Sequence, residues 1–295
     1  MLRILKAELF KLKKNTTFKV LCLIILLVSF FTIGMTKLMS SEGFIDSITK
    51  EMSESEKQAF EQQMQSVSEQ DTEIRLSSNM GMTISGEDPL HPTGKEVFYQ
   101  SFGNGIIEIF IAVLVGAMVA KEYSKGTVKN TLAYGVKRYK YYIGKVLAIS
   151  IGVIVLLAIL VSVSTAGICI FEGWGETFDF GEVLGILKVF GSASLATIAV
   201  TSLMVLLATV LKSNGSTIGI GIVLFSVVPM FLGIIYGIYG WLDNILKLIP
   251  AYTWATVVSP IATNGDLLRA VLVSIVTSVI ATFMGVWVIN KQDIK

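Results

Sequence analysis

The sequence predicts an all-α membrane protein with six transmembrane helices, and three observations lead to this fold class. Of the 295 residues, 53% are hydrophobic and only 16% are charged, whereas soluble domains carry about 25% charged residues. Several runs with little or no charge come close to the ~20 residues that a helix needs to cross a bilayer, or exceed that length. Basic residues are concentrated before the first run and in the segments that follow every second run, an alternation typical of multi-pass membrane proteins.

The apolar runs between charged residues define the expected spans. Backbone groups cannot be left unpaired in lipid, and the short alternating segments of a membrane β-barrel are absent, so each run is expected to be a helix. The apolar stretch around the second span itself begins near residue 97. The expected spans are residues 20–36, 105–120, 146–171, 183–211, 213–240 and 270–290.

The distribution of lysine and arginine predicts the orientation of these spans. Segments 1–19 and 121–145, Lys212 and the tail 291–295 together hold 16 of the 24 basic residues. Segment 37–104 instead has five basic residues against twelve acidic ones. Because basic loops stay in the cytoplasm, both termini and segment 121–145 are expected there, and segments 37–104 and 241–269 outside.

The segments outside the spans have local patterns of their own. In segment 1–19 leucines recur at three- and four-residue steps with lysines between them, which predicts an amphipathic helix lying against lipid headgroups or, alternatively, against a partner. Segment 37–104 is expected to be partly helical. In segment 241–269, Pro250 and Pro260 interrupt short apolar stretches, which indicates short re-entrant helices before the last span.

The loop at 121–145 is expected to fold as a helix, a break and a second helix. Val128 and Leu132 lie one helical turn apart. Gly135 interrupts this pattern, and a new helix from Lys137 is expected to run into the third span. A positive-inside anchor explains the seven basic residues of the loop, but it does not require this folded structure.

The sequence shows no enzyme motif. The two Gly-Lys pairs end at Lys95 and Lys145 and are followed by Glu96 and Val146, so neither fits the phosphate-binding G-x-x-x-x-G-K-[ST] loop. His91 is the only histidine and has no evident catalytic or metal-binding companion. We therefore expect no catalytic residue, metal or bound cofactor, and the net charge of +2 does not indicate a nucleic-acid partner.

One acidic residue, Glu108, lies within a predicted span. It precedes Lys121 by 13 positions, or about 19 Å along a helix, which places it in the outer half of the bilayer. Such a carboxylate usually faces a helix-bundle interior or water. Two interpretations remain open: a residue that lines a transport path or a subunit seam, or one that reaches the outer interface because the helix starts near Asn104.

Residues 121–145 resemble the membrane subunits of ABC exporters of the ABC-2 type. That family often carries E-Y-x-x-G-T after its second span, then a Leu, then V-x-R, and G-K at the start of the third span. Gly135 stands where the family often has a proline, and a turn survives that change. The matching positions are Glu122, Tyr123, Gly126, Thr127, Leu132, Val136, Arg138, Gly144 and Lys145.

The resemblance extends in layout over most of the chain, and the long segment 37–104 is similar to permeases of the bacitracin-resistance and bacteriocin-immunity type. It implies a permease in a bacterial plasma membrane that exports a hydrophobic or amphipathic substrate together with a second permease. An ATPase dimer, which binds ATP and Mg²⁺, would dock on the coupling helix. A stand-alone secondary transporter is the alternative. The implied docking residues are Glu122, Tyr123, Gly126, Thr127, Leu132 and Arg138.

Overall fold

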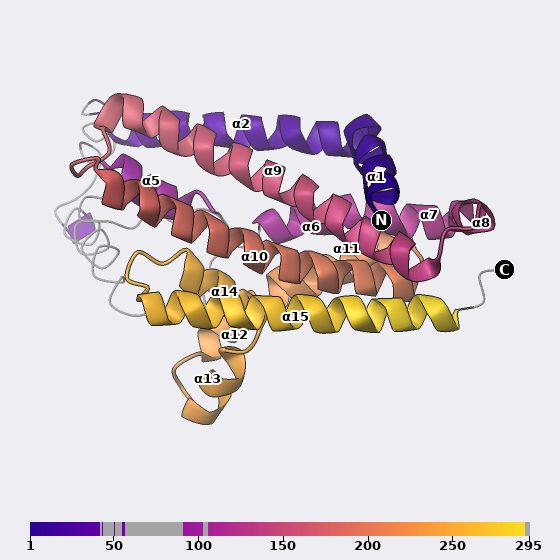
Figure 1. Ribbon diagram of the computed structural model, residues 1–295. Coiled ribbons are helices and arrows are strands. Elements are labelled where there is room, and N and C mark those ends of the chain that lie inside the picture. The colour runs from indigo at the N-terminus through magenta and orange to yellow at the C-terminus, as the bar shows by residue number, and fades with distance from the viewer. Residues whose placement is uncertain (42, 44–49, 51–54, 57–90, 103–105, 293–295) are drawn as a thin grey trace.

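The computed structural model describes residues 1–41, 43, 50, 55–56, 91–102 and 106–292. All regular structure in these ranges is helical, which confirms the predicted all-α class (Figure 1). Most of the expected outer segment 37–104 lies outside the described residues, so its predicted helices stay a prediction.

The described part of the chain forms long helices joined by short ones, and two of the described helical segments have π-helical hydrogen bonding. The described elements are α1 (Leu2–Lys14), α2 (Thr16–Met39), α5 (Gly94–Gln100), α6 (Ile106–Val115), the π-helix η2 (Gly116–Ala120), α7 (Lys121–Ser124), α8 (Thr127–Ala133), α9 (Arg138–Glu172), α10 (Phe180–Leu211), α11 (Asn214–Ile222), the π-helix η3 (Val223–Val227), α12 (Val228–Ile235), α13 (Gly240–Leu246), α14 (Pro250–Val257) and α15 (Asn264–Lys291).

Among the residues that the structure describes, five helical stretches are long and apolar enough to cross a membrane: α2, α9, α10, the continuous stretch Asn214–Ile235 and α15. The expected second span is not among them. Its helical stretch, residues 106–124, carries Glu108 near one end and Lys121 and Glu122 near the other. Five candidate spans are therefore found in the described chain, and the sixth stays a prediction, as does the topology.

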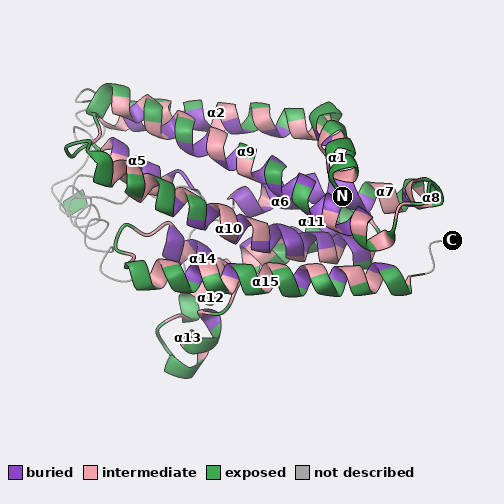
Figure 2. Cartoon of the chain, viewed as in Figure 1, coloured by how far each residue is buried: buried purple, intermediate pink, exposed green. Residues whose placement is uncertain are grey.

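The two longest helices, α9 and α10, form the centre of the bundle. Helix α2 packs along α9, α15 packs along α10, and α6 packs against both α10 and α11 (Figure 1). Buried positions follow the centre, whereas the outer faces of α2 and α15 expose large apolar side chains such as Phe31 and Phe283 (Figure 2). An apolar exterior is what contact with lipid chains requires.

Several helices begin or end away from the expected span limits. The fifth stretch ends at Ile235 rather than at 240, and Gly237, with φ +87°, follows it. The last helix begins at Asn264 rather than at 270, because Thr263 and Asp266 form a capping box at its first turn. The third long helix begins at Arg138, which agrees with the expected helical run from Lys137.

The segment before the last span contains two short helices, as predicted, and they differ in burial. Helix α14 packs against α10 and α15 and buries Tyr252 and Trp254. Helix α13 lies away from the bundle in Figure 1 and exposes Trp241. Whether these helices enter the membrane is a prediction that the fold does not test.

Candidate functional site

The loop predicted to dock a partner lies at one end of the bundle, beside α1 and the end of α15 (Figure 1). We name residues 121–138 the basic loop and this end of the bundle the basic end. The expected break at Gly135 is present, with φ +80°. A second break, at Gly126 with φ +69°, separates α7 from α8 and was not predicted. Only glycine adopts this left-handed conformation readily, so both breaks depend on their residue type.

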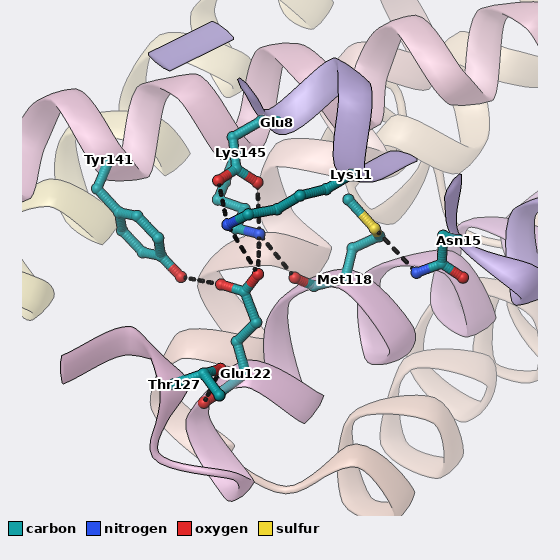
Figure 3. A network of polar contacts seen from close by, with 8 residues as sticks. All are labelled: Glu8, Lys11, Asn15, Met118, Glu122, Thr127, Tyr141 and Lys145. Carbon is teal, nitrogen blue, oxygen red and sulfur yellow. Dashed lines mark hydrogen bonds and ion pairs between the residues drawn. The ribbon is translucent and has the colours of Figure 1, made fainter. Parts of the chain in front are cut away.

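Glu122 anchors the first turn of the basic loop from inside. Its Oε1 accepts a hydrogen bond from Lys145 Nζ at 2.7 Å, and its Oε2 accepts one from the Tyr141 hydroxyl at 2.7 Å. Lys11 of α1 lies 3.3 Å from the same Oε1. Glu122 therefore joins α7 to α9 and to α1 (Figure 3).

Lys145 is the most buried charge of this group, with only 1% of its side chain exposed. Besides Glu122, its Nζ lies 2.6 Å from Glu8 Oε2 and donates to the carbonyl oxygen of Met118 at 3.0 Å. Lys11 Nζ completes the group at 2.7 Å from Glu8 Oε1. We name Glu8, Lys11, Glu122 and Lys145 the charge cluster, in which two carboxylates balance two ammonium groups (Figure 3).

Within the charge cluster, the electrostatics favour the ionised forms of Glu122 and Lys11. Burial by itself raises the pKa of Glu122, but the ammonium of Lys145 and the hydrogen bonds from Lys145 and Tyr141 outweigh it, so the pKa lies below the usual value. Burial by itself lowers the pKa of Lys11, but contacts with Glu8 and Glu122 outweigh it and raise that pKa. Buried charges need such partners, because an unpaired one is costly to desolvate.

Arg138 anchors the other end of the basic loop. Its Nη1 donates to the carbonyl oxygens of Ile289 at 3.0 Å and of Asn290 and Gln292 at 2.9 Å each. These carbonyls end α15, where a cation also interacts favourably with the helix dipole. Gln292 in turn donates to the carbonyl oxygen of Thr209 in α10 at 3.0 Å. The loop is thus held at both ends, by two different sets of helices.

Of the other predicted site residues, Tyr123 and Leu132 lie on the inner face of the loop and Thr127 lies on its outer face. Tyr123 and Leu132 are half-buried and pack against the core, as does the fully buried Val128. The Tyr123 hydroxyl is buried. Thr127 is exposed, and its hydroxyl donates to the Glu122 carbonyl oxygen at 3.3 Å across the Gly126 break.

The outward face of the loop carries basic and aromatic side chains. Lys125, Lys129 and Lys137 are exposed, and 88% of Tyr134 is accessible. The structure therefore separates two roles within the predicted docking set. Glu122 and Arg138 hydrogen-bond to the bundle, whereas the exposed surface of the loop is formed by Thr127 and by residues outside that set; docking by any of them stays a prediction.

Glu108 lies apart from the basic loop, in the first turn of α6, and is 6% exposed. Its helix packs against α10 and α11. The side chain thus faces the interior of the chain, and a role in a transport path stays a prediction.

Sequence reasoning missed Glu8, Lys11 and Tyr141 as site residues. The signal was present in α1: Glu8 is its single acidic residue and shares the buried face of the helix with Leu12. A lone carboxylate on an apolar stripe is costly to bury without a partner, so it indicates a cation nearby. Lys145 was part of the recognised motif, but its two carboxylate partners are apparent only in three dimensions.

The apolar helices, their lipid-compatible exterior and the charge-bearing loop define a multi-pass integral membrane protein. Over residues 3–294 the chain matches the sequence model of the family described as ABC-2 family transporter protein, and it belongs to that family. Membrane components of this family have no ATPase domain and work with a separate ATPase. No curated protein sequence matches the chain significantly.

Proposed function

We propose that this chain is the permease subunit of an ABC exporter and that its basic loop docks on the ATPase subunit. The observation that carries the proposal is how the loop is built. Helix α8 lies at the end of the bundle with one face exposed, and the residues on either side of it, Glu122 and Arg138, are hydrogen-bonded to the bundle. A loop that only joined two spans would not need these anchors.

The contacts of Glu122 and Arg138 are of the kind that would transmit movement from the loop to the bundle. Movement of the ATPase against α8 would pass through Glu122 into α1 and α9, and through Arg138 into α15 and α10. Rigid elements that contact both sites are the physical means by which one site influences another. The exposed lysines and Tyr134 favour a partner surface that is acidic and offers an apolar pocket.

The arrangement that follows is a complex in a bacterial plasma membrane with both termini of this chain in the cytoplasm. Two permeases, identical or related, would form the path at their seam, and an ATPase dimer would bind ATP and Mg²⁺. The basic end of the bundle faces the cytoplasm in this arrangement, in keeping with the charge asymmetry of the sequence.

The substrate class that suits this permease is hydrophobic or amphipathic: an antimicrobial peptide, a drug or a lipid-like molecule. Export of this kind would confer resistance or immunity, as in the bacitracin and bacteriocin systems that the sequence resembles. Glu108, buried near the start of α6, is the candidate residue of the path or seam.

Purification of the tagged chain from its native membranes tests the docking directly. We expect an ABC ATPase to co-purify with it. Tyr134→Ala should weaken its affinity by about tenfold or more, as truncation of an interface tyrosine commonly does. Tyr239→Ala is the matched control, because Tyr239 is 54% exposed but lies outside the basic loop.

Two outcomes would contradict the proposal. Equal ATPase binding by both tyrosine variants would show that the loop is not the docking surface. Transport by the purified chain alone, driven by an ion gradient, would favour the secondary transporter instead.

A further inference from the structure

The charge cluster joins helix α1 to the basic loop, although α1 lies far from the loop in sequence. Of the four charges, Glu8 and Lys11 come from α1, Glu122 from α7 and Lys145 from α9. Lys145 lies between the two carboxylates, 2.6 Å from Glu8 and 2.7 Å from Glu122. One buried ammonium group therefore links all three helices.

Helix α1 packs closely on α9, and this packing fixes the position of Glu8 relative to Lys145. Gly144 and Gly152 of α9 lie under α1, and a Cβ at these positions would approach Ile4 to 2.9 Å and Leu12 to 3.0 Å. Both glycines lie within helix α9, so the absence of a side chain, not an unusual backbone, is what the packing requires. Helix α1 thus sits on α9 through Ile4 and Leu12, on either side of Glu8.

We propose that α1 belongs to the docking unit, with Lys145 as the positioning residue that holds α1, α7 and the first turns of α9 together as one body. This inference rests on the proposed docking function and extends it to helix α1, which lies outside the basic loop. When the ATPase displaces the basic loop, α1 moves with it, and the motion reaches α2 through the junction at Asn15.

The charge balance explains why the link needs all of its members. Without the Glu8 carboxylate, Lys145 and Lys11 would share Glu122 alone, and a buried positive charge would remain. Such a charge favours water entry and separation of the helices. The body formed by α1, α7 and α9 would then divide at the α1 contact, while α7 would keep its bond to Lys145.

A disulfide between α1 and α9 provides the test. An ideal Cβ at Gly144 lies 3.9 Å from the Ile4 Cβ, within the ~3.5–4.5 Å that a disulfide spans. The Ile4→Cys and Gly144→Cys pair would be introduced after replacing the native Cys22 and Cys169 by alanine. Crosslinking is read by gel shift, without the ATPase, and transport is measured with the ATPase before and after oxidation.

With the cluster intact, we expect ready crosslinking and unchanged transport after oxidation, because the two helices already move together. Adding Glu8→Gln should slow crosslinking and reduce transport by about fivefold or more. Oxidation should then restore transport, and a reductant should remove it again. Glu182→Gln, which removes a partner of Lys95 at the other end of the bundle, is the matched control and should change neither measurement.

Loss of transport on oxidation of the otherwise unchanged protein would overturn the inference, since it would show that α1 must move relative to α9. Normal crosslinking and transport in Glu8→Gln would overturn it as well. A chain that fails to bind the ATPase would refute the proposed function instead, and the crosslinking rates would still report on the cluster. If Glu8→Gln fails to fold, the oxidised Ile4→Cys and Gly144→Cys protein with its cluster intact still decides, because its transport can be measured.

Discussion

Lys145 and Lys95 each bridge two glutamates, at opposite ends of the helix bundle. The distances are similar: 2.6 and 2.7 Å from Lys145 to Glu8 and Glu122, and 2.6 and 3.1 Å from Lys95 to Glu176 and Glu182. The surroundings differ, because the side chain of Lys145 is 1% exposed and that of Lys95 is 29% exposed.

The difference shows that the distance between two charges does not by itself determine how much an ion pair contributes to stability. Around Lys95 water screens the charges, and such pairs typically contribute between 0 and about 1 kcal/mol. Around Lys145 the charges have been removed from water, so each depends on the others. The buried cluster fixes how three helices meet, whereas the more exposed pairs add little to the packing of α5 against α9.

The largest expected effect is therefore the loss of Lys145. Lys145→Met leaves Glu8 and Glu122 with only Lys11 between them, and removal of one partner from a buried ion pair costs about 3–5 kcal/mol. Lys95→Met should cost less than about 1 kcal/mol. Thermal unfolding of both variants in the same detergent measures the contrast, and equal destabilisation would contradict it.

The second anchor of the basic loop should have a smaller effect. Arg138→Gln removes charged hydrogen bonds to the carbonyls at the end of α15, and one such bond contributes about 1.5–3 kcal/mol. We expect faster amide hydrogen exchange in the last turn of α15. Arg269→Gln, an exposed position at the start of the same helix, is the control; comparable exchange in the two variants would argue against the anchor.

The break between α7 and α8 should be sensitive to a single methyl group. Gly126 has φ +69° and open space around its Cβ position, so Gly126→Ala adds no clash but costs about 1–2 kcal/mol in backbone strain. Gly191→Ala adds the same methyl group within α10, also into open space, and should stabilise the helix by up to about 1 kcal/mol. Opposite signs in the unfolding temperature are predicted; a shared sign would contradict the strain.

Titration should have the smallest effect. Because the pKa of Glu122 lies below its usual 4.5, its contribution to stability is full above that pH and is lost as the pH falls through the lowered pKa. Because the pKa of Lys11 lies above its usual 10.5, its contribution is lost only as the pH rises through the raised pKa.

The unfolding temperatures of the wild type and Glu122→Gln should thus differ by a constant amount from about pH 5 to about pH 10. Melting curves in matched buffers across that range measure the difference. A gap that closes near neutral pH would contradict the lowered pKa of Glu122.

Periodicity and charge were sufficient to predict the helical class and most of the long helices, since an apolar run bounded by lysines has few alternatives in lipid. They also predicted the break at Gly135. The break at Gly126 was missed because a lone glycine within a helical pattern is usually tolerated. The cluster was missed because Glu8 and Lys145 are distant in sequence, and only the crossing of α1 over α9 brings them together.

The resemblance also implied docking roles for Glu122 and Arg138, which stay a prediction, and the structure adds that both side chains hydrogen-bond to the bundle. A motif identifies residues that a fold requires in one place, but it does not say which of them a partner touches. The exposed side chains of the loop include Lys125, Lys129 and Tyr134, and contact of a partner with them belongs to the proposed function.

The central claim is that the basic loop passes motion from an ATPase into the bundle through Glu122. The most direct measurement is the amount of substrate transported per ATP hydrolysed by the reconstituted complex, in the wild type and in Glu122→Gln. The account predicts that the variant binds the ATPase and hydrolyses ATP but transports about fivefold less per ATP, or still less. An unchanged ratio of transport to hydrolysis would contradict it.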